Sequence, residues 1–358
     1  MYIIGFESSC DETAVAIVEE REGRLFPVCS RVRTQIPLHR LYGGVVPEIA
    51  GRAHIEAISA LTAEALGEAK LSPKDLGCVA VTSHPGLIGA LLVGVNFAKS
   101  FAFANGLPLV EVDHMKAHMA AAYVEMGRAV PKPPFLGLAV SGGHTSLYLA
   151  EDYNRYREIG GTRDDAIGEA FDKVGRLLGL PYPAGAEFDS LAARGYARLC
   201  GKEGATLADY RRLPPSARSA YPLPSPALRD GSLDFSFSGL KTAAVNLAHT
   251  YTQKGEELDR EAFAAAYTAV AVEAVATHID TALATHGGLP LVMAGGVAAN
   301  SHLRLRMEEV CRAHGRELYV PPLSLCGDNG LMVAAQGWFC YREGQRATTA
   351  LNASAADF

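Results

Sequence analysis

Two segments of this chain have the pattern of a strand, a polar turn and a second strand, and this repeated pattern constrains the fold most strongly. The first runs from the apolar residues 2–6 through a polar turn over 7–13 to Ala14-Val18. The second runs from 135–140 through a Ser-Gly-Gly turn to 147–150. Short apolar runs joined by turn residues are typical of β-hairpins. The recurrence of the pattern after about 130 residues predicts two related lobes, each built on a sheet.

The other apolar runs predict strands that alternate with helices. In the first lobe we expect a helix over 51–69, a strand over 78–82, a helix over 86–104, a strand over 107–112 and a short helix with two histidines. In the second lobe we expect helices over 164–179 and 260–285, a strand over 289–294 and a last helix over 328–343. Such alternation is typical of α/β folds in which helices flank mixed sheets, with ligands in the cleft between lobes.

Proline-rich segments predict the boundaries. The run Pro131-Lys132-Pro133-Pro134 separates the lobes, which we place at 1–132 and 133–327, with the helix over 328–343 packing back on the first. Residues 201–234 are predicted to form an irregular insertion. The length of 358 residues agrees with two domains of ~150 residues each.

The composition favours a soluble, cytoplasmic protein. The longest apolar stretch, residues 86–110, is interrupted by Asn96, Lys99 and Asn105 and is predicted to be a poor membrane span, so we expect no membrane association. The N-terminus lacks a basic leader, and the seven cysteines lack a C-x-x-C pair, which is typical of reduced thiols.

The net charge of −6 excludes a global basic field for nucleic acid, so RNA contact would need a local patch or a partner. Ordinary surface charge explains the candidate arginines equally well: Arg31, Arg33, Arg40, Arg52, Arg211, Arg212 and Arg218.

Two histidines follow the strand predicted over 107–112. His114 and His118 are one helical turn apart, which places their Cβ atoms about 5–6 Å from each other, close enough to bind one metal ion. The end of a strand is also where open α/β sheets bind ligands. Asp328 is predicted first as the N-cap of the last helix, and its carboxylate would also suit a third metal ligand. Two unrelated histidines on a helix are the alternative.

Glycine pairs in two predicted turns suit a phosphate or nucleoside. Gly142 and Gly143, between Ser141 and His144, would let backbone N–H groups approach an anion. Gly295-Gly296 precede a predicted helix, whose N-terminus attracts phosphate, and Asn300 could hydrogen-bond a ribose or base. Tight connections between strands and helices are the alternative. No G-x-x-x-x-G-K-[ST] motif is present, which excludes a P-loop.

Carboxylates supply further candidates. Ser9, Asp11 and Glu12 lie in the first polar turn and could hold a hydrated cation or a water near phosphate, unless the turn is simply solvated. Asp172 lies on a helix face that would ordinarily be solvated. That helix leads into a turn ending at Gly185, with Asp189 four residues further on.

Together these motifs resemble the tRNA threonylcarbamoyladenosine transferase family, formerly named O-sialoglycoprotein endopeptidase. The resemblance is nearly full-length, and seven segments carry it: 5–13, 42–48, 114–118, 140–145, 168–173, 235–242 and 293–300. Two positions depart from the family pattern: His84 stands where glycine is frequent, and Ala184 where a second glycine is common. Neither departure removes an expected ligand.

The resemblance implies the actin, Hsp70 and sugar-kinase (ASKHA) fold, with two lobes around a nucleotide cleft. It implies one divalent metal, Fe²⁺ first and Zn²⁺ as the alternative, held by His114, His118 and Asp328. It also implies that an adenine nucleotide, as threonylcarbamoyl-AMP, ATP or ADP, is bound by Ala139, Val140, Ser141, Gly142, Gly143, Asp172, Gly185, Asp189 and Asn300.

The implied reaction transfers a threonylcarbamoyl group from its adenylate to the N6 amine of the adenosine beside the anticodon, in tRNAs that read codons beginning with adenine. The implied partners are tRNA, an inactive paralogue of the same fold (TsaB type) and a small ATPase (TsaE type), and a homo-oligomer is a further expectation. No catalytic residue is assigned beyond the metal site.

Three other functions are alternatives for such a sequence. A zinc protease would carry glutamate after the first histidine, in H-E-x-x-H, whereas Met115 stands there. A small-molecule kinase of the same fold would leave the histidine pair without a role. A non-catalytic nucleotide-binding scaffold would bind the nucleotide without turnover.

Overall fold

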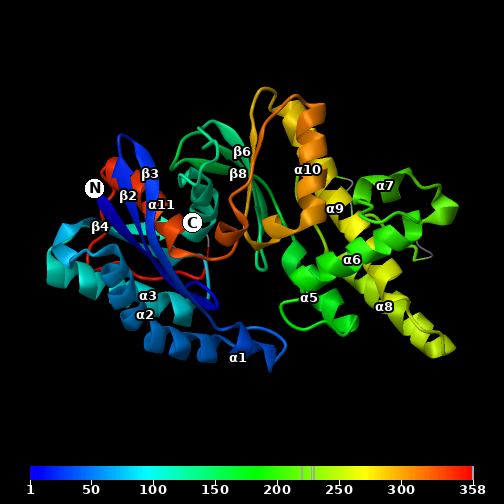
Figure 1. Cartoon of the computed structure of the whole chain (residues 1–358), viewed down its shortest axis with the longest axis horizontal. Coiled ribbons are helices and arrows are strands. Elements are labelled where there is room, and N and C mark those ends of the chain that lie inside the picture. The colour runs from blue at the N-terminus through cyan, green and yellow to red at the C-terminus, as the bar shows by residue number, and fades with distance from the viewer. Residues whose placement is uncertain (219–220, 227, 229, 357–358) are drawn as a thin grey trace. The chain divides into compact units, whose positions relative to one another are not determined.

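The computed structural model describes the chain except for residues 219–220, 227, 229 and 357–358. The chain divides into two compact units (Figure 1). The first comprises Met1–Phe135, Ala150–Tyr156 and Tyr319–Phe358. The second comprises Leu136–Leu149 and Arg157–Leu318. Both the first and the last segments of the chain therefore belong to the first unit.

The sheet of the first unit has the strand order β3-β2-β1-β4-β5. The predicted hairpin is formed by β1 (Tyr2–Glu7) and β2 (Glu12–Arg21), which pair antiparallel, while β4 (Leu76–His84) and β5 (Leu109–Asp113) run parallel to β1. The edge strand β3 (Arg24–Thr34) was not predicted. Its apolar residues 25–29 are interrupted by Pro27 and followed by Arg31 and Arg33, a pattern that an edge strand tolerates but that does not identify a buried strand.

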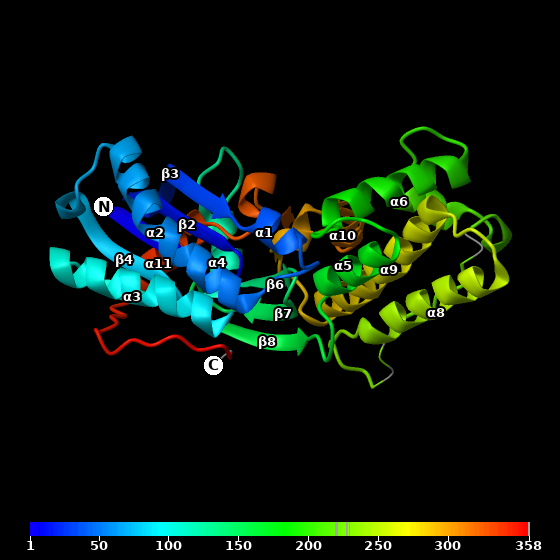
Figure 2. The ribbon, with the colours of Figure 1, turned by 90° about the horizontal axis from the view of Figure 1, so that it is seen from below.

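Helices cover both faces of this sheet because successive strand residues point to opposite sides. Ile4 and Phe6 of β1 pack into a cluster with α2 (Pro47–Ala69) and α3 (Ile88–Asn105), which lie side by side in Figure 2. Gly5, on the other face, contacts α11 (Gly330–Arg342), because a Cβ at Gly5 would lie 2.5 Å from Gly330 O. Two shorter elements complete the described part of this unit, apart from single 3-10 turns: α1 (Ile36–Arg40) and α4 (His114–Ala120). The short strand β10 (Leu318–Tyr319) spans the boundary between the units in sequence and belongs to the second sheet.

The sheet of the second unit has the order β10-β9-β6-β7-β8, with β6 (Phe135–Val140) parallel to β9 (Leu291–Ala294). The remaining elements of this unit are β7 (Thr145–Ala150), β8 (Tyr156–Gly161), α5 (Ile167–Leu177), α6 (Gly185–Cys200), α7 (Leu207–Arg212), α8 (Ser238–Lys254), α9 (Arg260–Thr285) and α10 (Ser301–Ala313). Helix α9 lies at the centre of the helical part, where Tyr267 meets the rings of Phe171 and Phe188 at 5.7 Å. The predicted span of 260–285 is confirmed.

Two predictions at helix ends were wrong, and one helix lies in a segment predicted to be irregular. Asp328 is not the N-cap of the last helix, because Asn329 Oδ1 accepts the hydrogen bond from Met332 N at 3.0 Å. Helix α5 begins at Ile167 instead of 164, since the Asp164 carboxylate accepts hydrogen bonds from Phe237 N and Ser238 N at the start of α8. The insertion over 201–234 is not wholly irregular, because it contains α7; its residues 219–220, 227 and 229 lie outside the described part.

The apolar stretch over 86–110, expected to be a poor membrane span, contains α3 and the start of β5. By length and composition alone, α3 and α9 are each apolar enough to cross a membrane. The core helices of folded proteins meet the same criteria, and 78% of the apolar window of α9 is buried within the protein.

Candidate metal centre and glycine-rich turns

The histidine pair sits where β5 passes directly into α4. Asp113, the last residue of β5, caps α4 by accepting hydrogen bonds from Met115 N at 2.8 Å and Lys116 N at 3.2 Å. The cap starts the helix at His114, so His118 follows one turn later. The two rings lie 4.5 Å apart, and both are buried.

The structure brings Asp328 to this pair from a segment more than two hundred residues away. Its Oδ1 atom lies 3.6 Å from His114 Nε2 and 3.3 Å from His118 Nε2. One ligand atom from each residue lies within 4.8 Å of the others. Asp328 reaches this position because α11, which begins two residues later, packs directly on the backbone of β2: a Cβ at Gly330 would lie 2.5 Å from Ala16 N.

The chemistry of these three residues fits a divalent transition metal. Neither ring nitrogen of His118 has a hydrogen-bond partner within the described residues, although both are buried. A buried polar atom left unpaired costs about 1–3 kcal/mol, so a polar ligand at this position would be stabilising. Two imidazoles and one carboxylate form a ligand set used for both zinc and non-haem iron.

The other nitrogen of His114 faces a carboxylate that sequence analysis did not assign. Glu7, at the end of β1, is fully buried, and its Oε2 atom lies 3.2 Å from His114 Nδ1. Ser9 Oγ lies equally close, at 3.2 Å. The position of Glu7 at the end of an apolar strand was the one indication in the sequence that it is buried. The sequence did not show which strand would bring a partner to it.

Charges around His114 control its protonation. Burial acts to lower the pKa of His114, but the negative charges of Asp328 and Glu7 outweigh it and raise the pKa to about 9. Burial acts to raise the pKa of Glu7, and the charge and hydrogen bond of His114 bring it below the usual value. In the metal-free protein the two groups therefore form a buried ion pair.

The first polar turn is folded in, with Asp11 only 8% exposed. His54, a buried residue of α2, anchors it: Nδ1 lies 2.8 Å from Thr13 Oγ1 and Nε2 lies 3.0 Å from Cys10 O. Burial, together with the charges of Asp328 and Asp11, raises the pKa of Glu12 to about 9, so this carboxyl is largely neutral at pH 7. The turn thus lies within electrostatic reach of the metal centre. His84 also lies close by, with Nε2 3.9 Å from Asp113 Oδ2.

The predicted nucleotide-binding residues all lie in the second unit, where tight contacts join their turns. Gly168, at the start of α5, lies against the Ser141-Gly142 turn, since a Cβ there would be 2.4 Å from Ser141 O. Gly295 has a positive φ of 97°, and a Cβ there would be 2.3 Å from Val140 O. Gly142 and Gly143 themselves have nothing within 4 Å of a Cβ position, so their backbone is accessible.

The polar members of this set also hold the turns in place. Asp172 Oδ1 accepts a hydrogen bond from Ala184 N at 2.7 Å, which joins α5 to the turn before α6. Asp189 accepts hydrogen bonds from Ser301 N at 3.0 Å and Ser301 Oγ at 2.8 Å. Asn300 Oδ1 caps α10 by accepting from Leu303 N at 2.9 Å. Each of these side chains therefore has a structural role alongside any role toward a ligand.

Most of the candidate RNA-binding arginines have local partners. Arg52 pairs with Glu48 at 2.7 Å, Arg31 pairs with Glu68, and Arg212 lies 3.8 Å from Asp209. Arg211 contacts Glu273 and Glu309. Arg218 donates to Leu213 O and Arg211 O. These pairings reduce the positive potential available to a polyanion.

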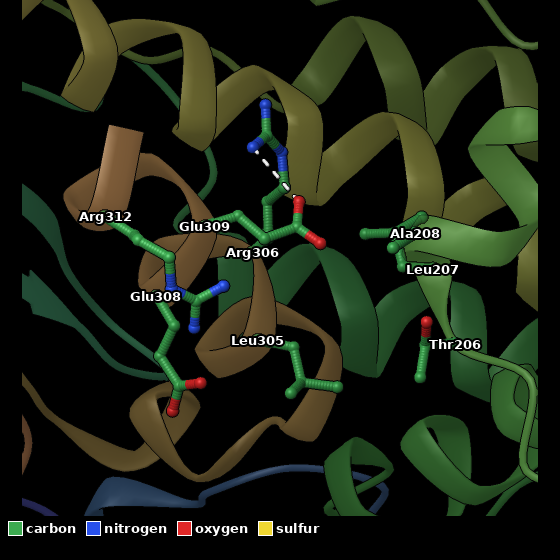
Figure 3. Close-up of a pocket in the computed structure, with 8 residues that line it drawn as sticks. All are labelled: Thr206, Leu207, Ala208, Leu305, Arg306, Glu308, Glu309 and Arg312. Atoms are coloured by element: carbon green, nitrogen blue, oxygen red, sulfur yellow. Dashed lines mark hydrogen bonds and ion pairs between the residues drawn. The ribbon is translucent and has the colours of Figure 1, made fainter. Parts of the chain in front are cut away.

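The second unit also has a small pocket (Figure 3), and one of its lining residues, Glu309, is the ion-pair partner of Arg211. It is lined by α7 and α10 side chains, among them Leu207, Leu305 and Arg306. Arg306 pairs with Glu309 at 3.3 Å, and none of the predicted site residues lines it. We assign it no role.

Two mixed sheets with flanking helices define an α/β fold of the actin-like type. The crystal structure of full-length HypF in the phosphate- and nucleotide-bound form has a similar fold, with a TM-score of 0.54 and 15% sequence identity. The match covers 99% of this chain and 47% of that chain. At this identity the likeness shows the fold alone. The predicted mixed sheets with flanking helices in an actin-like fold are thereby confirmed, and the nucleotide cleft between the lobes stays a prediction.

Sequence comparison defines the family within that class. The family model for tRNA N6-adenosine threonylcarbamoyltransferase (TsaD) matches residues 28–335. The enzyme of that name from Geobacillus thermodenitrificans is 45% identical over 99% of this chain and 96% of its own length. The Geobacillus kaustophilus enzyme is 44% identical with the same coverage. The chain belongs to the tRNA N6-adenosine threonylcarbamoyltransferase family and is a transferase that places a threonylcarbamoyl group on tRNA adenosine.

Proposed function

We propose that this transferase uses one divalent metal, Fe²⁺ or alternatively Zn²⁺, bound by His114, His118 and Asp328. The observation that carries the proposal is His118, a buried imidazole with no hydrogen bond in the described structure and with Asp328 3.3 Å from its Nε2 atom. A purely structural histidine in such a position would be expected to have a hydrogen-bond partner. When bound, the metal would orient the substrate and polarise one of its oxygens.

The adenylate part of threonylcarbamoyl-AMP is proposed to bind the turns of the second unit. The accessible backbone of Gly142 and Gly143 supplies N–H donors for phosphate, and Ala139, Val140 and Ser141 lead into that turn. Asn300 has its Oδ1 atom engaged by the helix cap, so its amide Nδ2 is the atom available to a ribose or base. Asp172 and Asp189 hold the neighbouring turns, including Gly185, around this set.

The transfer itself needs no nucleophile from the protein. The N6 amine attacks the carbonyl carbon of the threonylcarbamoyl group, a C–N bond forms, and the C–O bond to phosphate breaks. AMP leaves with that electron pair, and the amine loses one proton. Backbone donors in the glycine turn stabilise the charge that moves onto AMP. The substrate is proposed to be the adenosine beside the anticodon, in tRNAs reading codons that begin with adenine.

Partners of two kinds are proposed on the basis of the family. These are an inactive paralogue of the same fold (TsaB type) and a small ATPase (TsaE type). Self-association and a cytoplasmic location are proposed as well. Helices α2 and α3 offer apolar side chains for such contacts, since Ile55 is 65% exposed and Phe103 is 79% exposed.

A transfer assay on unmodified tRNA, with threonylcarbamoyl-AMP and the partner proteins, tests the metal proposal. His118→Ala is expected to lose both bound metal and transfer. His249→Ala, which removes an exposed histidine of α8, is the matched control and should retain both. Transfer at the wild-type rate by His118→Ala would remove this centre from the reaction. Loss of transfer together with intact adenylate binding in that variant would distinguish a transferase from a nucleotide-binding scaffold.

A further inference from the structure

Glu7 is a buried carboxylate beside the metal centre that was not among the predicted site residues. It is completely buried, and both its oxygens are engaged: Oε1 accepts a hydrogen bond from Ser9 N at 2.6 Å, and Oε2 accepts one from Thr82 Oγ1 at 2.6 Å. Oε2 also lies 3.2 Å from His114 Nδ1. A carboxylate is costly to bury, so this degree of engagement calls for an explanation.

The sheet holds Glu7 in place. β1 pairs in parallel with β4, with Phe6 opposite Val81, so the next residue of each strand brings Glu7 beside Thr82. On its other side, Glu7 pairs with Ala14 of β2. The carboxylate therefore comes from the interior of a sheet and has little freedom to move away from His114.

We infer that Glu7 is a positioning residue that keeps the proton of His114 on Nδ1, so that Nε2 presents its lone pair to the metal. This inference rests on the proposed metal centre. An ionised carboxylate only accepts hydrogen bonds, so the ring atom facing it must be the N–H. In a neutral imidazole the remaining nitrogen then carries the lone pair, and that nitrogen is the one 3.6 Å from Asp328.

The neighbouring Ser9 hydroxyl cannot replace Glu7 in this role. Although Ser9 Oγ also lies 3.2 Å from His114 Nδ1, a hydroxyl can either donate or accept and so does not select a tautomer. Charge supports the same assignment. The carboxylates of Glu7 and Asp328 lie on the two sides of the His114 ring, and their negative charge would favour a divalent cation at Nε2.

Cobalt binding to the metal-stripped full-length protein tests the inference, with Co²⁺ as a spectroscopic probe for Fe²⁺ or Zn²⁺. Glu7→Gln keeps the size of the side chain and removes its charge. It is expected to weaken Co²⁺ affinity by about 10- to 100-fold and to shift the visible Co²⁺ absorption band. Glu111→Gln, the same change at an exposed site on β5, should bind Co²⁺ as the wild type does.

The outcomes separate the inference from the proposal beneath it. Wild-type affinity and spectrum in a folded Glu7→Gln protein would overturn the role of Glu7 while leaving the metal centre intact. A wild-type protein that binds no Co²⁺ would overturn both. If Glu7→Gln does not fold, Glu7→Asp keeps the charge and withdraws it from His114; weakened affinity there supports the inference, and unchanged affinity refutes it.

Discussion

The contact between α11 and the sheet gives a prediction that links packing to the metal centre. Gly330→Ala would place a methyl group 2.5 Å from Ala16 N and 2.8 Å from Val15 C, in the middle of the first sheet. Carbon contacts are optimal near 3.5–4.0 Å, so α11 must retreat by about 1 Å, because the backbone of a central strand cannot. Overpacking of this kind typically costs about 1–3 kcal/mol of unfolding free energy.

Asp328 lies two residues before Gly330 and would move with the helix. Metal binding would then require Asp328 and α11 to return to the strained position. If that costs the same amount, about 1–3 kcal/mol, the metal affinity falls by about 5- to 150-fold. Chemical denaturation of the metal-free protein measures the first quantity, and metal titration against a chelator measures the second. Gly327→Ala is the matched control, because a Cβ at Gly327 meets nothing within 4 Å. Wild-type stability and wild-type affinity in Gly330→Ala would refute the reasoning.

Three further predictions follow from single residues. Because the pKa of His114 is raised from 6.5 to about 9, its ion pair stabilises the metal-free fold fully below about pH 6.5 and is lost as the pH rises through 9. The melting temperature of the metal-free wild type should therefore fall more across this pH range than that of His114→Ala. Equal dependence of the two melting temperatures on pH would contradict the assignment. Asp164→Ala should lower the unfolding free energy by about 0.5–2 kcal/mol in denaturant titrations, since it removes the acceptor for two backbone N–H groups at the start of α8; no measurable change would show that the cap is dispensable. Asn300→Asp keeps the cap of α10 but removes the amide donor, so calorimetry should show adenylate binding weakened by at least about 0.5–1.5 kcal/mol at unchanged stability, whereas unchanged binding would exclude the proposed contact.

Local periodicity and motif spacing were enough to predict much of the fold. Both hairpins and the helix over 260–285 were confirmed, because each has a long or repeated pattern that tertiary contacts do not override. The edge strand β3 was missed because an exposed strand tolerates arginine and proline. The start of α5 was misplaced because Asp164 caps a different helix, more than seventy residues later in the chain.

The site could be predicted only in part. The spacing of His114 and His118 on one helix is a local property, whereas the approach of Asp328 depends on how α11 packs against β1 and β2. The contact of Glu7 with His114 depends on the parallel pairing of β1 with β4, which no nearby residue specifies. The nucleotide-binding assignments remain predictions, and so do the lobe boundaries at 132 and 327.

Metal content and transfer measured on the same samples test the central claim most directly. Wild-type protein would be stripped with a chelator, reloaded with graded amounts of Fe²⁺ or Zn²⁺, and assayed for threonylcarbamoyl transfer to tRNA with its partners. The account predicts saturation at one metal per chain and a transfer rate that rises in proportion to occupancy. Full transfer by the stripped protein, at every level of loading, would contradict it.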